Sequence, residues 1–453
     1  MASTEEIPVI DPHDYCDFIC RGEGQANVVI GAKHKETGVR CVWRIGKIRK
    51  TRYISVQPNC EIIGDYMKKI ITPLLGSRYL SEMKLVKFDI MDVQNLGKLV
   101  RMPENTLIKD FEFFTKVSPN VSALRLMDIL NMENGDYRQN ADSDYLVAFQ
   151  MIDATELPPV VMSGTLNPII TIEIKPKQGF YQQHEGIDIN LCQTCIYTME
   201  KVYDQEKFSR LSHFCPIRLY SGDYVQTVAT LSALFMEPHR NLKIFMNGNV
   251  IHSDEIHIKD EDMTKKLFPN GNAEKDDLIQ ALAFLLTDST SIENFNLHPK
   301  SVLYRIVNAQ KIDEIGLIKA HEIYDKLSPD EQEQFMDKKR LSDIGLEAIV
   351  GEPSSENSGI HALNKYFLAA TIKDCSVMIS LRLLNNLPSG KVDSMIKLTN
   401  GKMFQYTTKI VDLDPKDARN LTSGYKRFIA GARLYKEHYE EINAQGYHFN
   451  CNI

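Results

Sequence analysis

The nine residues 171–179 constrain the fold of this chain more than any other segment. They read Thr-Ile-Glu-Ile-Lys-Pro-Lys-Gln-Gly, so Ile172 and Ile174 alternate with charged residues, and this two-residue period is typical of a half-buried strand. Pro176 has no N–H to donate to a central ladder, so we expect the strand to stop or to reach a sheet edge there. Gly179 then permits a tight turn. One carboxylate and two ammonium groups in a fixed order suit a phosphate-rich ligand, although for an arbitrary Lys-Pro-Lys an edge strand with solvated charges is the better interpretation.

The length and charge of the chain limit what that ligand can be. With 453 residues, the chain is too long for one small core and is expected to form two or three lobes. Its net charge of -7 argues against general nucleic-acid binding. Basic residues nevertheless gather at 47–52, 175–177 and 416–427. A mildly acidic protein with local basic clusters fits a small, highly anionic ligand better than a polymer.

The cysteines and the N-terminus indicate the compartment. Cys192 and Cys195 form a lone CxxC pair without a second CxxC at zinc-finger distance. We therefore interpret all 9 cysteines as reduced thiols, many of them buried. The N-terminus is polar and unlike a signal peptide, and no apolar run reaches ~18 residues, so we expect no membrane span. These features predict a cytoplasmic or nuclear protein.

The hydrophobic patterns predict an α+β chain, with a β-rich first part and a larger second part that contains more helix. Residues 302–327 have a helical period that is interrupted near Gly316. The strand patterns lie at 14–55, 145–151, 371–383 and 405–413.

A glycine pair near the N-terminus supplies a candidate phosphate loop. Residues 21–27 read Arg-Gly-Glu-Gly-Gln-Ala-Asn, and a Gly-x-Gly turn between two strands lets backbone N–H groups approach phosphate oxygens. The loop lacks the full dinucleotide and Walker signatures, so a plain hairpin turn remains the simpler interpretation. Arg44 on the next strand stands where a kinase-like lobe keeps a lysine on the nucleotide, or it is an ordinary surface residue.

Two aspartates at strand ends are candidates for phosphoryl-transfer chemistry. That chemistry needs one carboxylate near the acceptor hydroxyl and another on Mg²⁺. Asp374 and Asp412 match those two tasks, although for each motif taken singly a turn-capping aspartate or a solvated strand end is the better explanation. No His-Arg-Asp or Asp-Phe-Gly motif occurs, which argues against a protein kinase.

Six segments that occur in one order resemble the inositol-pentakisphosphate 2-kinase family. The resemblance runs from about residue 18 to about residue 430, nearly the whole chain. The segments are Gly-Glu-Gly-x-Ala-Asn (22–27), Glu-Ile-Lys-Pro-Lys-x-Gly-Phe (173–180), Cys-Pro-Ile-Arg-Leu-Tyr-Ser-Gly (215–222), Asn-Leu-Lys-Ile-Phe-Met-Asn-Gly (241–248), Lys-Asp-Cys-Ser-Val-Met-Ile (373–379) and Val-Asp-Leu-Asp (411–414).

The resemblance implies a bilobal, distantly protein-kinase-like fold. An N-lobe would span 1–149, and a C-lobe would span 150–453 with an inositide-binding region near 185–290. It also implies that ATP, with Mg²⁺, phosphorylates the 2-hydroxyl of inositol 1,3,4,5,6-pentakisphosphate to give the hexakisphosphate, phytate. We expect these substrates as the partners of a monomer, with no membrane and no direct nucleic acid. A kinase for another inositol phosphate and a non-catalytic inositide-binding scaffold remain as alternatives.

The resemblance also implies a role for each matching residue. Lys175 would lie near the transferred phosphoryl group, Asp374 would serve the acceptor hydroxyl and Asp412 would hold Mg²⁺. Because His321 has no CxxC after it, the zinc site of plant-like members is missing, and no structural zinc is expected. The nucleotide-binding residues would be Gly22, Gly24, Gln25, Ala26, Asn27, Arg44, Gln150, Ile152, Glu173 and Asp412. The inositide-binding residues would be Arg49, Arg138, Lys177, Lys201, Arg240, Asn241, Lys416 and Arg419.

Overall fold

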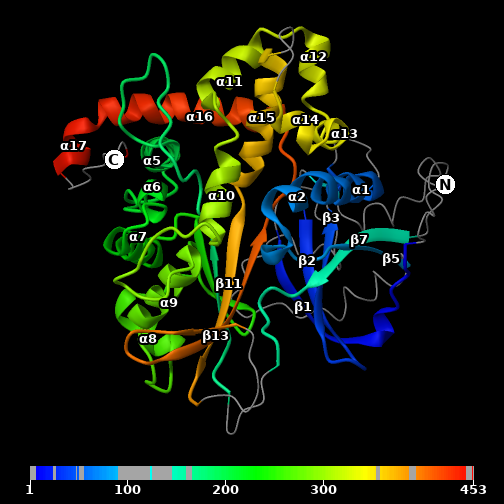
Figure 1. The fold of residues 1–453 in the computed structure, drawn as a ribbon, viewed down its shortest axis with the longest axis vertical. Helices are drawn as coiled ribbons and strands as arrows, with labels where there is room; N and C mark the ends of the chain where they lie inside the picture. Colours follow the sequence, from blue (N-terminus) through cyan, green and yellow to red (C-terminus); the bar gives the residue numbers. More distant parts are fainter. Residues whose placement is uncertain are drawn as a thin grey trace. The chain divides into compact units, whose positions relative to one another are not determined.

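The chain forms two units, each built around an antiparallel sheet with helices (Figure 1). The first comprises Met1–Asp65, Ser81–Glu156 and Gly248–Val250, and the second comprises the rest of the chain. The α+β class expected from the sequence is confirmed. The computed structural model describes residues 7–23, 27–46, 48–49, 56–89, 123–124, 145–159, 166–352, 358–386, 394–444 and 451.

The sheet of the first unit has five strands in the order β1-β2-β3-β7-β5. Its core gathers around the fully buried Trp43, whose ring contacts Tyr15, Phe18 and Phe88. The strands predicted at the start of the chain and at 145–151 are confirmed. The elements are the 3₁₀ turn η1 (Pro12–Asp14), β1 (Tyr15–Glu23), β2 (Asn27–His34), β3 (Arg40–Gly46), β4 (Ile48–Arg49), α1 (Val56–Tyr66), β5 (Lys84–Asp89), β6 (Ala123–Leu124) and β7 (Tyr145–Ile152).

The sheet of the second unit has six strands in the order β10-β9-β8-β11-β13-β12. Strand β8 lies in the interior, where Ile174 pairs with Leu242 on one side and with Val377 on the other. It ends at Ile174, two residues before Pro176, so the predicted stop is confirmed and the edge-strand alternative is wrong. The strands are β8 (Ile170–Ile174), β9 (Leu242–Met246), β10 (Asn249–His252), β11 (Ser376–Leu384), β12 (Met395–Lys397) and β13 (Met403–Val411).

Helices pack against this sheet and against each other, and α16 packs on α5 and α11 (Figure 1). The predicted break near Gly316 is confirmed, because Gly316 takes a φ of 74° at the start of a new helix, where the carboxylate of Asp313 accepts its N–H at 2.8 Å. No helix in the described ranges is long and apolar enough to cross a membrane. The helices are η2 (Met67–Ile71), α2 (Thr72–Leu75), η3 (Ser77–Tyr79), α5 (Gln193–Met199), η5 (Glu200–Asp204), α6 (Pro216–Leu219), α7 (Tyr224–Met236), α8 (Asp260–Leu267), α9 (Lys275–Thr287), α10 (Val302–Gln310), α11 (Gly316–Asp325), α12 (Pro329–Gln334), α13 (Arg340–Ile344), α14 (Leu346–Val350), α15 (Ser358–Lys373), α16 (Ala418–Glu437) and α17 (Tyr439–Ala444).

The segment 371–383 differs from its predicted strand. Helix α15 continues to Lys373, and β11 begins only at Ser376. The β-branched pair Thr371 and Ile372 favours a strand locally, but both side chains are fully buried in the last turn of α15, so tertiary packing overrides that preference. As a result, Asp374 lies in the short link between a helix and a strand rather than within a strand.

Candidate functional site

The end of β8 places three charged residues beside one another. Glu173 lies within β8 and accepts a hydrogen bond from the hydroxyl of Ser376 at 2.9 Å. Lys175 extends the ladder by one more bond, since its N–H donates to the carbonyl of Asn241 at 2.8 Å. Lys177 lies beyond the strand, with a φ of 60°. Of the three residues, only Glu173 therefore belongs to the strand.

Asp374 is the centre of this site. Its Oδ1 accepts from the ammonium of Lys177 at 3.0 Å, and its Oδ2 accepts from the ammonium of Lys416 at 2.8 Å. The ammonium of Lys175 lies 4.0 Å from Oδ1 and also donates to the backbone carbonyl of Asp374 at 3.2 Å. Two lysines from the segment after β8 and one from the segment after β13 thus converge on one carboxylate, which stays 40% exposed.

These charges control the protonation of the site. Burial raises the pKa of the Asp374 carboxyl, but Lys177, Lys416 and Lys175 outweigh burial and hold that pKa well below its usual range. Burial lowers the pKa of Lys175, but Asp374, Asp412 and Glu173 raise it more, so the net direction is upward. The carboxylate is therefore ionised at neutral pH and is a weak base.

Asp412 supplies a second carboxylate next to the first. It directly follows β13, with a φ of 61°, and its Oδ2 accepts from the ammonium of Lys175 at 2.7 Å. Because Asp412 is 44% exposed, its oxygen atoms are accessible to a hard cation such as Mg²⁺, which prefers carboxylate and phosphate oxygens. Lys175 therefore bridges the two carboxylates that the sequence singled out.

Gln310 holds the loop that carries Lys177, and no sequence signal pointed to it. Its fully buried side-chain amide donates to the carbonyl of Lys177 at 2.7 Å and accepts from the N–H of Gly179 at 2.9 Å. The glycine is needed for close packing and not for the predicted tight turn, since a Cβ there would lie 2.6 Å from the ring of Tyr220. The two hydrogen bonds of Gln310 and the packing of Gly179 on Tyr220 therefore hold the loop 177–179 in place.

A second group of cations lies around η5. Burial, followed by the charges of Lys177, Arg427 and Arg240, lowers the pKa of Lys201 to about 8. Arg427 on α16 lies 4.5 Å from the centre of the Tyr197 ring, and its Nε donates to Glu200 at 3.2 Å. The sequence placed Arg427 in a basic cluster but gave it no role. Its proximity to Lys201 arises from the packing of α16 on α5 and η5.

Three other predicted inositide ligands occupy different positions. Arg240 is exposed, has a φ of 61° and lines a cavity of ≈ 200 Å³ together with Lys175, Asn241 and Asp254. Asn241 is mostly buried beside β9. Arg419 instead forms an ion pair with Asp417, the N-cap of its own helix α16. Arg240 and Asn241 therefore lie at the site, whereas the guanidinium of Arg419 is paired with the carboxylate of Asp417.

The described nucleotide ligands predicted in the first unit lie on one sheet. Gly22 is the next-to-last residue of β1, Asn27 begins the paired strand β2, and Arg44 lies on β3. The Gln150 side chain accepts from the indole of Trp43 at 3.0 Å, while Ile152 at the end of β7 is exposed. The structure does not describe the other predicted residues of this loop, which are Gly24, Gln25 and Ala26. Arg138 and the side chain of Arg49 also lie outside the described part of the chain.

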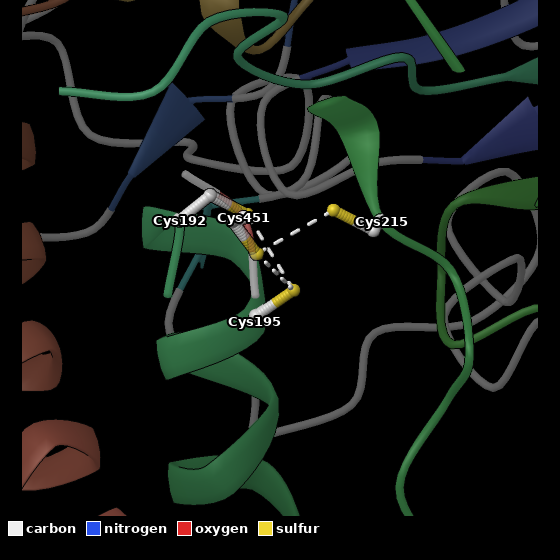
Figure 2. A group of neighbouring side chains, drawn as sticks. All are labelled: Cys192, Cys195, Cys215 and Cys451. Carbon is white, nitrogen blue, oxygen red and sulfur yellow. Dashed lines mark hydrogen bonds between the residues drawn. The ribbon is translucent and has the colours of Figure 1, made fainter. Parts of the chain in front are cut away.

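The CxxC pair is not isolated in space. Cys215 and Cys451 join Cys192 and Cys195, and the sulfur atoms of all four lie within 4.8 Å of one another (Figure 2). The sequence gave no signal for this cluster, because Cys451 lies 256 residues beyond Cys195. The CxxC pair, which has no second CxxC in the sequence, therefore has two further buried cysteines beside it in space.

Comparison with known proteins gives one consistent result. The family model described as inositol-pentakisphosphate 2-kinase matches residues 21–427. An inositol-pentakisphosphate 2-kinase of Arabidopsis thaliana is 27% identical, over 92% of this chain and 93% of that protein. The protein of the same name from Danio rerio is 25% identical, over 92% of each chain. The match covers both carboxylates and all the lysines around them, and the chain belongs to the inositol-pentakisphosphate 2-kinase family of transferases.

Proposed function

We propose that this chain transfers the γ-phosphoryl group of ATP to the 2-hydroxyl of inositol 1,3,4,5,6-pentakisphosphate, giving the hexakisphosphate. Membership of the family supports an inositol phosphate kinase. The observation that carries the finer proposal is the convergence of Lys175, Lys177 and Lys416 on Asp374. The proposed enzyme is a monomer in the cytoplasm or nucleus, with no membrane or nucleic-acid partner.

The charge of the acceptor explains why so many cations gather here. A pentakisphosphate carries roughly eight to ten negative charges near neutral pH, from the charge of each phosphate group. Placing it beside ATP requires several cations to offset the repulsion between phosphates. Lys177 and Lys416 would exchange the oxygens of Asp374 for phosphate oxygens, and Lys201 and Arg427 would bind phosphates on the η5 side. Arg240 and Asn241 would contact the inositide, with Arg419 as an outer ligand.

The proposal also names the residues that would bind the nucleotide. Glu173 would face the nucleotide, and the exposed carboxylate of Asp412 would hold Mg²⁺, which when bound would neutralise charge on the β- and γ-phosphates. A distantly protein-kinase-like division into an N-lobe over 1–149 and a C-lobe over 150–453 remains part of the proposal. The proposed contacts from the first unit are those of Gly22, Gly24, Gln25, Ala26, Asn27, Arg44, Gln150 and Ile152.

The chemistry asks little of Asp374 as a base. The hydroxyl oxygen attacks the γ-phosphorus, the bond from that phosphorus to the β–γ bridging oxygen breaks, and ADP leaves. Asp374 orients the hydroxyl and accepts its proton late, since a loose transition state needs little general-base help. This role agrees with its lowered pKa, because an early proton transfer would need a stronger base. Lys175 would stabilise the phosphoryl group during its transfer.

Radiolabelled ATP and a panel of inositol phosphates test the proposal. The expected result is rapid labelling of inositol 1,3,4,5,6-pentakisphosphate alone, with the new phosphate placed on the 2-position by NMR. Labelling of another inositol phosphate would favour the first alternative. Binding of the inositide without turnover would favour the scaffold. Either result would overturn the proposed reaction.

Matched lysine variants test whether the cluster forms the acceptor site. Lys416→Met removes one of the two ammonium groups bonded to Asp374, and we expect a rise in KM for the inositide of about 10-fold to 100-fold, from about 1.5–3 kcal/mol for a charged hydrogen bond. Lys397→Met on the exposed strand β12 removes an equal charge elsewhere. An equal effect of both variants on KM would contradict the assignment.

A further inference from the structure

We infer that Cys192, Cys195, Cys215 and Cys451 bind one structural Zn²⁺ ion through four thiolates. The inference does not depend on the proposed reaction, and it opposes the expectation from the sequence that the chain holds no structural zinc. It rests on the identity of the four donors, the distances between them and the chain segments that carry them.

The donors come from three segments that the fold brings together. Cys192 is the N-cap of α5, and Cys195 lies in the first turn of the same helix, so the two side chains project from one side of it. Cys215 is the N-cap of α6. Cys451 comes from the C-terminal segment, where its N–H donates to the carbonyl of Asn190 at 2.8 Å. Figure 2 shows the four side chains pointing toward one another.

The distances between the sulfur atoms suit one tetrahedral ion. A Zn–S bond is about 2.3 Å, which places the four sulfurs of a tetrahedral site about 3.8 Å apart. The sulfur of Cys195 lies 3.5 Å from that of Cys192 and 3.8 Å from that of Cys451, and the sulfurs of Cys215 and Cys451 are 3.6 Å apart. These three distances are therefore close to the edge length of the required tetrahedron. The two sulfur atoms of a disulfide, in contrast, lie about 2.05 Å apart.

The surroundings of the cluster favour a metal over free thiols. All four residues are at most 3% exposed, and a thiol is only a weak hydrogen-bond donor and acceptor. Four thiols bonded mainly to each other would contribute little stability. Four thiolates are the preferred ligand set of a closed structural zinc site, and because the protein occupies every position of the ion, no position remains for a substrate.

The site would connect distant parts of the second unit. Cys451 lies 236 residues after Cys215 and 256 residues after Cys195. An ion at this point would fasten the C-terminal segment to the start of α5, the helix that continues into η5 and Lys201. The free energy of binding the ion becomes stability of the folded chain, because the unfolded chain does not hold the four thiolates together.

Metal analysis of the full-length protein tests the inference. Protein purified without chelator is expected to contain about one zinc per chain. X-ray absorption at the zinc edge is expected to show four sulfur neighbours at about 2.3 Å. Titration with an organomercurial is expected to release the zinc in step with four thiols. These measurements use the unaltered chain, so they do not depend on whether a variant folds.

Serine variants identify the ligands. Cys192→Ser and Cys451→Ser are expected to lower the zinc content well below that of Cys16→Ser, which alters a cysteine outside the cluster. Protein without zinc in which all four thiols are free would overturn the inference. An intact mass that shows disulfides within the cluster, or zinc bound by nitrogen and oxygen ligands, would overturn it as well.

Discussion

Replacement of Lys201 by methionine is expected to stabilise the second unit while weakening inositide binding. The ordinary pKa of lysine is 10.5, and in the folded protein the pKa of Lys201 is lowered to about 8, first by burial and then by Lys177, Arg427 and Arg240. This difference of about 2.5 pKa units, at about 1.36 kcal/mol each, amounts to about 3 kcal/mol of folding free energy lost by keeping the charge. Methionine has a similar length and no charge to desolvate.

The gain is partly offset by a lost contact. The ammonium of Lys201 lies 5.8 Å from the centre of the Phe208 ring, and a cation–π contact of this kind contributes about 0.5–1 kcal/mol. Near neutral pH, the net stabilisation of Lys201→Met is therefore about 2 kcal/mol. Binding of the pentakisphosphate should weaken by about 10-fold to 100-fold if Lys201 forms a charged hydrogen bond with a phosphate, by the usual 1.5–3 kcal/mol.

The pH dependence gives the prediction a sign. Between pH 8 and pH 10.5, the unfolded chain retains a proton on Lys201 that the folded chain has lost, so this group makes stability rise with pH in that window. Below pH 8, Lys201 is charged in the folded chain, and the full free-energy cost of burying that charge is present. The advantage of the Lys201→Met variant should therefore be largest near neutral pH and should shrink as the pH approaches 10.5.

Urea unfolding followed by two probes measures the effect. Trp43 is the only tryptophan of the chain and belongs to the first unit, so its fluorescence follows that unit. Far-UV circular dichroism mostly follows the helices of the second unit. The dichroism transition should move to higher urea in Lys201→Met, and titration calorimetry should show weaker inositide binding. A lower dichroism midpoint, or a midpoint equal to that of Lys397→Met at every pH, would refute the reasoning.

Three further substitutions test the loop and the carboxylate. Asp374→Asn should reduce turnover by about 10²-fold to 10⁴-fold, the usual contribution of an acid–base group, with inositide affinity by calorimetry no weaker; retained turnover would contradict the role of Asp374. Gly179→Ala should cost about 1–3 kcal/mol by overpacking against the Tyr220 ring, measured by urea unfolding, and an unchanged midpoint would show that the ring moves freely. Gln310→Leu leaves the carbonyl of Lys177 without its partner and should raise KM for the inositide more than it lowers kcat, whereas equal changes in both would indicate a merely structural role.

Local patterns predicted those parts of the fold that local interactions determine. The alternation around Ile174 gave the strand β8 and its stop before Pro176. The break at Gly316 was also visible, since glycine tolerates the positive φ that the helix start requires. The strand at 371–383 was mispredicted because its first residues have a β-preference that burial in α15 overrides. Such an override depends on neighbours that are distant in sequence.

The candidate site shows the same division. The carboxylates Asp374 and Asp412 were recognisable because each follows or precedes a strong apolar run within its motif. Gln310 was not recognisable, because an amide on a helix has no pattern that reveals a contact 133 residues away. Cys451 was missed for the same reason, since a fourth ligand at arbitrary spacing has no motif. Contacts between residues that are far apart in the sequence depend on the whole fold, so no local pattern predicts them.

The bonds between Asp374 and its lysines have a consequence for selectivity among anions. Any anion that enters must compete with a carboxylate that is permanently attached to the protein and therefore present at a high effective concentration. Under the proposed function, a singly phosphorylated molecule would gain too few contacts to displace it, whereas a ring bearing several phosphates would contact Lys177, Lys416 and their neighbours at once. The internal carboxylate thus sets a threshold in valency, which under the proposed function would favour a densely phosphorylated ring over a singly phosphorylated molecule.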